Sequence, residues 1–201
     1  MSRSTPGQPP AAWQRLQPFP GSLPQPLAER LELRGACTWQ QGQLRLRFQL
    51  QGALESLILP AVSPAPARCV GLWQHTCLEA FWGQRDQLRY WELNASPSGD
   101  WALYRFERYR HGQLPEPLPK PPHSLWTLTP ATAGRAAQLA LELVLEGPAA
   151  ATGAAALAAG DLELSLTAVL EHADGRLSYW ALAHPGPEPD FHDRQGFRLQ
   201  R

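Results

Sequence analysis

One segment of the chain, residues 71–110, combines large aromatic side chains with a few directional polar groups. It reads GLWQHTCLEAFWGQRDQLRYWELNASPSGDWALYRFERYR and holds four of the eight tryptophans. Its polar candidates are His75, Glu79, Glu92 and Asn94. Aromatic faces supply contact area, while carboxylates and amides supply oriented hydrogen bonds, and this combination is typical of small-molecule sites. The segment therefore predicts binding chemistry.

The spacing of these polar residues suggests that they alternate across strands. In a strand, side chains two positions apart share a face, so Glu79 would share a face with His75 and Cys77. Glu92 would likewise share a face with Asn94 on a later strand. An acid between Leu78 and Ala80 must face solvent or have a buried partner, because isolated burial of a charge is costly. Whether the two polar faces meet is left open by the sequence.

Most of the remaining chain also alternates with a period of two, which indicates strands. Turn-forming residues at 97–100 and 172–175 predict two antiparallel hairpins. About ten short strands, separated by Gly-, Pro- and Asp-rich segments, predict an all-β antiparallel sandwich. The expected strands cover residues 31–33, 44–50, 57–59, 75–82, 88–94, 101–109, 125–129, 138–145, 161–170 and 177–184.

The length of 201 residues fits one domain, which we expect to span residues 27–201. Residues 1–26 are rich in Pro, Gly and Ser and predict a poorly ordered lead-in that packs only through Trp13 and Phe19. The proline-rich residues 115–122 predict an extended surface connection. The Ala-rich residues 149–159 predict a loop with at most a short helix.

Composition excludes several classes of protein. Eighteen Lys and Arg balance eighteen Asp and Glu, and the basic residues are scattered, so nucleic acid is not an expected partner. We find no apolar run of the length that a signal peptide or a membrane span requires, and we therefore expect a cytoplasmic protein without membrane contact. Three cysteines without a close pair support neither a disulfide framework nor a zinc knuckle.

Three blocks of the sequence resemble a bacterial family of uncharacterised DOMON-like proteins, from Leu27 to the C-terminus. The blocks are GLWQHTCLEAFW, YWELNASPSGDWALYRFERYR and SYWALAHPGPEPDFHDRQGF. The resemblance implies a jelly-roll-type β-sandwich related to the family 9 carbohydrate-binding modules, in a superfamily known to bind sugars or haem. Because fold alone does not imply function, this likeness names ligand classes only.

A residue-level likeness to the family 9 modules implies particular site residues. Those modules use a tryptophan, a glutamate six positions later and an asparagine on the following strand, which Trp73, Glu79 and Asn94 match. Their second stacking tryptophan lies late in the chain, where Trp180 is available. Glu92 departs from the pattern, because the modules tend to carry a basic residue two positions before the asparagine. An acid there would change which hydroxyls or charges the site accepts.

From these residues we expect a non-catalytic module for a sugar or sugar-like ligand. Trp73 and Trp180 would stack on the ligand, Glu79 and Asn94 would hydrogen-bond its polar groups, and His75 would donate or tune near neutral pH. A buried, core position for Trp73 remains an open alternative.

Other functions stay open beside this one. A haem b module is one alternative, but Met1 is the only methionine, so haem would need two histidines or one with an open position. The histidines are His75, His111, His123, His172, His184 and His192. A protein-interaction domain without a small ligand is a second alternative, and a glycosidase-like carboxylate pair, Glu79 and Glu92, is a third.

Two further clusters have competing structural explanations. Arg105, Arg108 and Arg110 could recognise an anion, but exposed strands commonly carry Arg to solvate an outer face. The segment Asp190-Phe191-His192 has compact ligand spacing, yet a metal needs three or four converging ligands. We expect this segment to pack on the sandwich through Phe191, and we expect no metal site.

Overall fold

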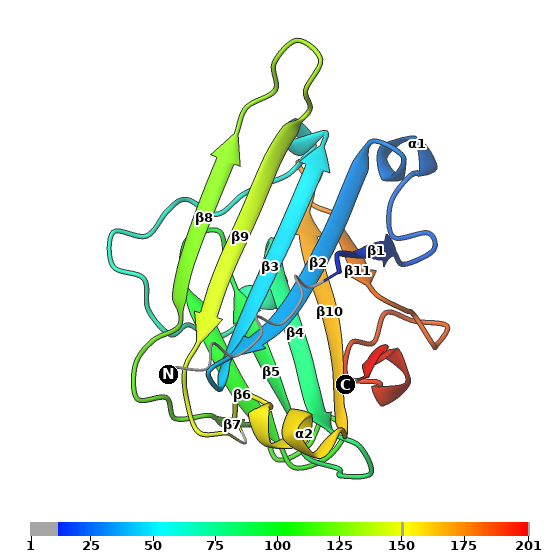
Figure 1. The fold of residues 1–201 in the computed structure, drawn as a ribbon. Helices are drawn as coiled ribbons and strands as arrows, with labels where there is room; N and C mark the ends of the chain where they lie inside the picture. The colour runs from blue at the N-terminus through cyan, green and yellow to red at the C-terminus, as the bar shows by residue number, and fades with distance from the viewer. Residues whose placement is uncertain (1–11, 150, 201) are drawn as a thin grey trace, which may run out of the picture.

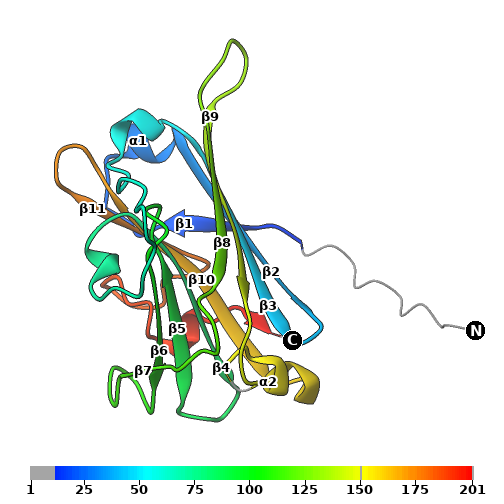
Figure 2. The ribbon, with the colours of Figure 1, turned by 90° about the vertical axis from the view of Figure 1, so that its left-hand side faces the viewer.

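Two antiparallel β-sheets pack face to face in the computed structural model, which confirms the all-β sandwich (Figures 1 and 2). The structure describes residues 12–149 and 151–200. Hydrogen bonding connects the strands in the order β7-β6-β5-β4-β10-β11-β1-β2-β3-β9-β8, and β12 pairs with β10. We call β2, β3, β9 and β8 the front sheet, and β7, β6, β5, β4, β10, β11 and β12 the back sheet.

The strands are short and separated by turns, as the sequence pattern predicts. The front sheet contains β2 (Leu31–Gln40), β3 (Gln43–Gly52), β9 (Ala137–Leu145) and β8 (His123–Thr129). The back sheet contains β7 (Leu114–Pro115), β6 (Trp101–Phe106), β5 (Tyr90–Ala95), β4 (Cys77–Gln84), β10 (Leu162–Glu171), β11 (Leu177–Ala181) and β12 (Leu199–Gln200). The turns at 97–100 and 172–175 do join antiparallel pairs, β5 with β6 and β10 with β11.

Strand β1 (Gln14–Pro18) links the two sheets and corrects the expected domain boundary. It pairs with β2 through Leu16↔Leu33 and with β11 through Pro18↔Trp180. Leu16 is completely buried. Residues 1–11 of the expected lead-in lie outside the described residues, but the sheet begins well before Leu27. Backbone pairing with a strand on each side and burial of Leu16 together hold this segment in the fold.

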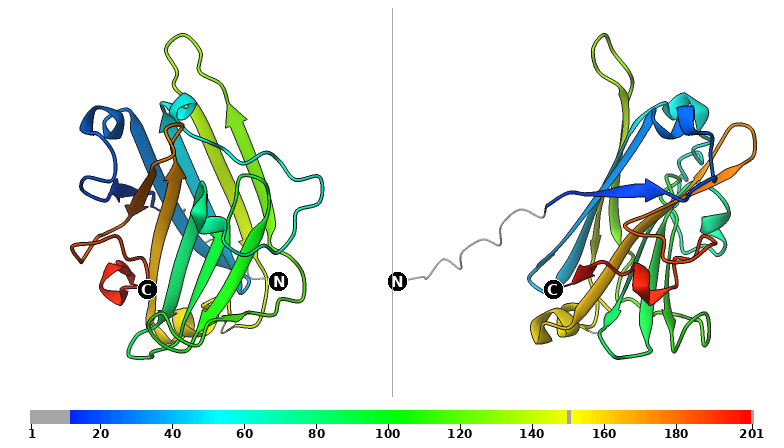
Figure 3. Two further views of the ribbon diagram at one scale, coloured as in Figure 1. Left: turned by 180° about the vertical axis from the view of Figure 1, so that it is seen from behind. Right: turned by 90° about the vertical axis from the view of Figure 1, so that its right-hand side faces the viewer.

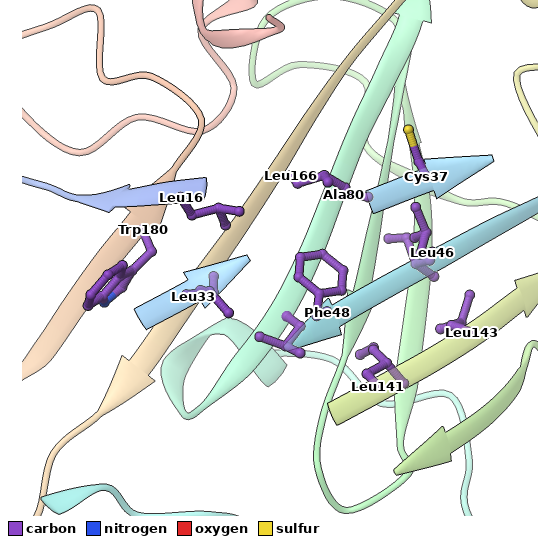
Figure 4. Packing of buried hydrophobic residues seen from close by; sticks show 14 of the residues in the cluster. Leu16, Leu33, Cys37, Leu46, Phe48, Ala80, Leu141, Leu143, Leu166 and Trp180 are labelled. Carbon is purple, nitrogen blue, oxygen red and sulfur yellow. The ribbon is translucent and has the colours of Figure 1, made fainter. Parts of the chain in front are cut away.

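The core lies between the sheets, and both of them supply its side chains (Figure 4). Phe48 of the front sheet and Leu166 and Trp82 of the back sheet are at most 2% exposed. At Gly35 the layers approach closely, because an added Cβ would lie 2.7 Å from a Leu166 methyl carbon. Trp180, which Figure 4 labels, belongs to this core.

Helical structure is limited to short connections. These are α1 (Gln25–Ala28), η1 (Leu54–Ser56), η2 (Leu72–Gln74), α2 (Ala154–Ala159) and η3 (Arg194–Gly196). The expected strand at 57–59 is wrong: Leu57 makes one isolated bridge to His172, and Pro60 then lacks the N–H that a longer ladder would need. Helix α2 occupies the Ala-rich segment, between left-handed Gly153 and Gly160. In the part of the chain that the structure describes, no helix is long and apolar enough to cross a bilayer.

The two sheets differ in how their outer faces are covered. Strand β3 alternates between buried and more exposed residues, as expected when one face is solvated. Seven of the eight residues of β4 and all six of β5 are buried. The outer face of the back sheet, turned toward the viewer in the left panel of Figure 3, is therefore covered by other parts of the chain.

Candidate functional site

A cavity of about 530 Å³ lies on the outer face of the back sheet. Residues from five strands form its floor: Glu79 and Phe81 of β4, Glu92 of β5, Phe106 of β6, Val169 of β10 and Tyr179 of β11. Its walls come from connecting segments and consist of Trp73, Arg110, Gln113, Glu188, Pro189, Phe191 and His192. The volume falls in the range of small-molecule pockets.

Strand register brings the two predicted polar faces together. Glu79 is the direct cross-strand partner of Asn94, and Phe81 is the partner of Glu92. Glu79 and Glu92 are therefore diagonal neighbours on one face, within reach of each other's side chains. The question that the sequence left open is answered by this register, because Glu79, Glu92 and Asn94 all point to the outer face.

The segment after β11 covers the cavity; we call residues 188–193 the C-terminal strap. Asp190 anchors it by accepting hydrogen bonds from Tyr109 and from Arg110, whose Nη2 lies 2.9 Å from Oδ1. Phe191 and His192 pack on Phe81, with ring centroids 6.3 and 5.2 Å away. The strap thus packs on the sandwich, with Phe191 as one of its contacts.

Arg194 fixes the chain just beyond the strap. Its guanidinium donates to the backbone carbonyls of Gln84 and Gln87 at 2.9 and 3.0 Å, and to Glu163 at 2.7 Å. Hydrogen bonds between an ionised guanidinium and a carboxylate are among the stronger ones in proteins. The cover of the cavity is therefore held at both ends.

His192 sits in a chain of hydrogen bonds that determines which nitrogen faces Glu92. The Tyr90 hydroxyl accepts the Arg110 backbone N–H at 3.1 Å and lies 2.8 Å from His192 Nδ1. In the tautomer in which this hydroxyl donates its proton to Nδ1, the ring proton lies on Nε2. Nε2 is 3.8 Å from Glu92 Oε2, too far for a direct hydrogen bond. A donor is thus left available beside the carboxylate.

Burial shifts the pKa values of Glu92, Glu79 and His192. It raises the pKa of Glu92 to about 7, against the opposing effect of the Asn94 hydrogen bond. Burial, and then the nearby Glu92 carboxylate, raise the pKa of Glu79 well above its usual range. Burial lowers the pKa of His192 to about 4, so this imidazole is neutral near pH 7.

One oxygen of Glu79 has no hydrogen-bond partner. Oε2 accepts from Thr167 Oγ1 at 3.3 Å, whereas Oε1 is buried and finds no partner among the described residues. The polar partner that the sequence required for this acid is therefore only half present. Unpaired buried acceptors are unfavourable, and at a cavity wall they mark a position where a ligand can donate.

Trp73 lies at the cavity rim rather than in the core. It belongs to η2, which follows the left-handed Gly71, and it is 51% exposed. The alternative of a core position is therefore excluded. An indole that is half exposed beside an apolar and acidic floor can form a stacking surface for a ring.

Asn94 lies on the same outer face as Glu79 and Glu92 and supports the site through a hydrogen bond. It is 1% exposed, and its Nδ2 donates to Glu92 Oε1 at 2.6 Å. Asn94 is not among the residues that line the cavity in the described part of the chain. Asn94 therefore orients the Glu92 carboxylate instead of meeting a ligand itself.

Two expected site residues lie elsewhere. Trp180 is 2% exposed in the core, because Tyr179 faces the cavity and adjacent residues of a strand point to opposite faces. His75 is exposed, and its Nδ1 lies 2.8 Å from Glu171 Oε2. It precedes β4, so strand alternation does not direct it toward Glu79.

Sequence reasoning missed several residues of the cavity. Tyr179 could have been predicted by placing Trp180 in the core, because adjacent residues of a strand point to opposite faces. Glu188 and His192 carry no such signal, because their position depends on how the strap folds back over β4. Of the three arginines considered, Arg110 lines the cavity, but its guanidinium is paired with Asp190. Among the described residues, no group of three or more His, Cys, Asp or Glu could hold a metal ion.

Comparison with known proteins supports the fold. The structure is similar to the crystal structure of a putative carbohydrate-binding protein from Bacteroides uniformis ATCC 8492, with a TM-score of 0.63 and 13% sequence identity. The alignment covers 93% of this chain and 84% of that chain. No protein-family profile and no curated protein matches the sequence. At this identity the likeness concerns the β-sandwich architecture.

Proposed function

We propose that the protein is a non-catalytic binding module for a sugar or sugar-like molecule. The observation that carries this proposal is the cavity of about 530 Å³, in which buried carboxylates lie beside aromatic rings. Sugars present apolar C–H faces and ring hydroxyls, so they need flat aromatic surfaces and oriented polar groups together.

Each residue has a defined part in this proposal. Trp73 stacks on one face of the sugar ring at the cavity rim. Glu79 and Glu92 accept hydrogen bonds from hydroxyls, and the Nε2 proton of His192 is donated to a ligand oxygen. Asn94 holds the Glu92 carboxylate in position through the 2.6 Å hydrogen bond.

Two likenesses support the choice of ligand class. The similar fold of the Bacteroides uniformis protein, a putative carbohydrate-binding protein, is one of them. The resemblance of three sequence blocks to DOMON-like domains is the other, and membership of that group is part of the proposal. Both are arguments by analogy, so the named side chains carry more weight.

The positions of the carboxylates favour binding over catalysis. A glycosidase needs one carboxyl group as a general acid and a second as a nucleophile or base across the scissile bond. Here Glu79 and Glu92 lie on adjacent strands, as diagonal neighbours on one floor. Asn94 donates to Glu92 and Thr167 donates to Glu79, so we assign both acids to hydrogen bonding and expect the sugar to be recovered unchanged.

Isothermal titration calorimetry with a panel of mono- and disaccharides tests the proposal. Trp73→Ala should weaken binding of the best sugar by about 1–3 kcal/mol, because a stacking surface is lost. Trp13→Ala is the matched control. Trp13 is 40% exposed and packs against Arg47, outside the cavity lining, so its removal should leave affinity unchanged.

Three results would contradict the proposal. No binding of any sugar in the panel would remove its basis. Equal losses in Trp73→Ala and Trp13→Ala would show that the cavity is not where the sugar binds. Release of shortened or altered sugars on long incubation would show catalysis instead of binding.

A further inference from the structure

More acidic than basic side chains line the cavity. Its described lining includes three carboxylates, Glu79, Glu92 and Glu188, and one guanidinium, that of Arg110. That guanidinium is engaged by Asp190 at 2.9 Å. His192 supplies no charge near pH 7, because burial lowers its pKa to about 4. Among the described lining residues, Arg110 is therefore the one permanent cation, and its guanidinium pairs with Asp190 rather than with either floor acid.

The floor carboxylates also have unused acceptor capacity. Glu79 Oε1 is buried without a partner in the described chain, and the residue is only 2% exposed. Glu92 Oε1 accepts from Asn94, and Oε2 lies 3.8 Å from His192 Nε2, beyond hydrogen-bond distance. Burial without a cation or enough donors disfavours the ionised form of both acids and raises their pKa values, so a positively charged donor bound beside them would stabilise the carboxylates.

Aromatic rings surround these acceptors. Phe81, Phe106 and Tyr179 line the floor, Phe191 lies in the strap, and Trp73 stands at the rim. Ring faces attract cations, and a set of aromatic rings beside a carboxylate is an arrangement suited to ammonium groups. A neutral hydroxyl would gain less from the same surroundings.

We infer that the ligand carries an ammonium group, as an unacetylated amino sugar does, and that this group binds between Glu79 and Glu92. This inference rests on the proposed sugar-binding function and adds the charge of the ligand. The ammonium group would donate to Glu79 Oε1 and Glu92 Oε2, while the sugar ring stacks on Trp73. An N-acetyl group would remove the charge and two of the donors.

Calorimetry with matched ligand pairs tests the inference at about pH 6.5, below the ordinary pKa of an amine. Because burial raises the pKa of Glu92 to about 7 and that of Glu79 above its usual range, binding of the ammonium group should release protons from these acids. Glucosamine should bind at least tenfold more tightly than glucose or N-acetylglucosamine. Cyclohexylamine and cyclohexanol form a second pair that lacks the sugar hydroxyls. Glu79→Gln and Glu92→Gln should each abolish most of the preference for the amine. Glu142→Gln is the matched control, because Glu142 is exposed on β9 and lies outside the cavity lining, and it should change the preference less than threefold.

The outcomes separate the two proposals. Equal binding of glucose and glucosamine, lost in Trp73→Ala, would keep the sugar module and overturn the ammonium inference. Binding of cyclohexylamine but of no sugar would support ammonium recognition and contradict the sugar module. No binding of either amine would overturn the inference. If Glu79→Gln does not fold, the Glu92→Gln result decides.

Discussion

The outer faces of the two sheets show how one fold can make both a solvated wall and a binding site. On β3 of the front sheet, Arg45 is exposed and Arg47 is half-buried, while Leu44 and Leu46 are buried. On β4 of the back sheet the outer residues Glu79 and Phe81 are buried as fully as the inner ones. The strap and the η2 segment account for this difference, because both line the cavity above the back sheet.

A strand can lack the alternation between buried and exposed residues for two reasons. A strand that is apolar on both faces is simply buried. A strand that is buried on both faces and still carries an acid is different, since the acid must be stabilised by a partner. On β4 and β5 that pattern coincides with the cavity, and on the front sheet it does not occur among the described strands.

The largest expected effect is a loss of stability, and it should be greater for a substitution on the inner face of β10 than for one on its outer face. Leu166→Ala should lower the free energy of unfolding by about 2–5 kcal/mol, because it leaves a cavity in the core where Gly35 packs closely. Val169→Ala, at the cavity wall, should cost less, since the space beside it is already open. Denaturant unfolding measures both. A cost below about 1 kcal/mol for Leu166→Ala would contradict the assignment of the inner face.

The effect of pH on stability should distinguish the buried Glu92 from an exposed acid such as Glu142. Because the pKa of Glu92 is raised from 4.5 to about 7, the folded state keeps a proton that the unfolded chain has already released between these values. Stability due to this group therefore falls as pH rises from about 4.5 to 7 and stays low above that. Glu92→Gln should be as stable as the wild type at about pH 4 and more stable by roughly 3 kcal/mol at about pH 8.

The variant must be compared with the wild type at each pH, because His192 changes stability with pH in the direction opposite to Glu92. Its lowered pKa of about 4 means that the unfolded chain binds a proton first as pH falls, so its contribution to stability rises with pH between about 4 and 6.5. Glu142→Gln, on the exposed side of β9, is the control and should change stability little at any pH. A stability difference for Glu92→Gln that does not vary with pH would show that Glu92 does not titrate as described.

The smallest expected effects come from two arginines that pack over tryptophans. Arg68 lies 4.4 Å from the Trp101 ring and donates to the carbonyls of Leu103 and Glu116 at 2.8 and 2.7 Å. Arg68→Ala should cost about 1–2 kcal/mol. Arg47, on β3 of the front sheet, lies 5.1 Å from the Trp13 ring. Its replacement by Ala should cost under about 0.5 kcal/mol. Thermal unfolding measures both, and equal costs would remove this difference between the sheets.

Much of the fold follows from local pattern. The period of two predicted most strands, and turn residues predicted the β5–β6 and β10–β11 hairpins. The same alternation placed Glu92 and Asn94 on one face. It could not reveal β1, because five residues with one buried leucine carry too weak a signal.

The sequence by itself determined which residues alternate and where turns interrupt them, because these depend on neighbours along the chain. Only the tertiary structure decided which face is the core. That choice moved Trp180 inward and Tyr179 to the cavity, although the two are adjacent. It also brought His192 beside Glu92, one hundred positions earlier in the chain, because the strap folds back over the sheet. Contacts between segments so far apart depend on packing, which local pattern does not encode.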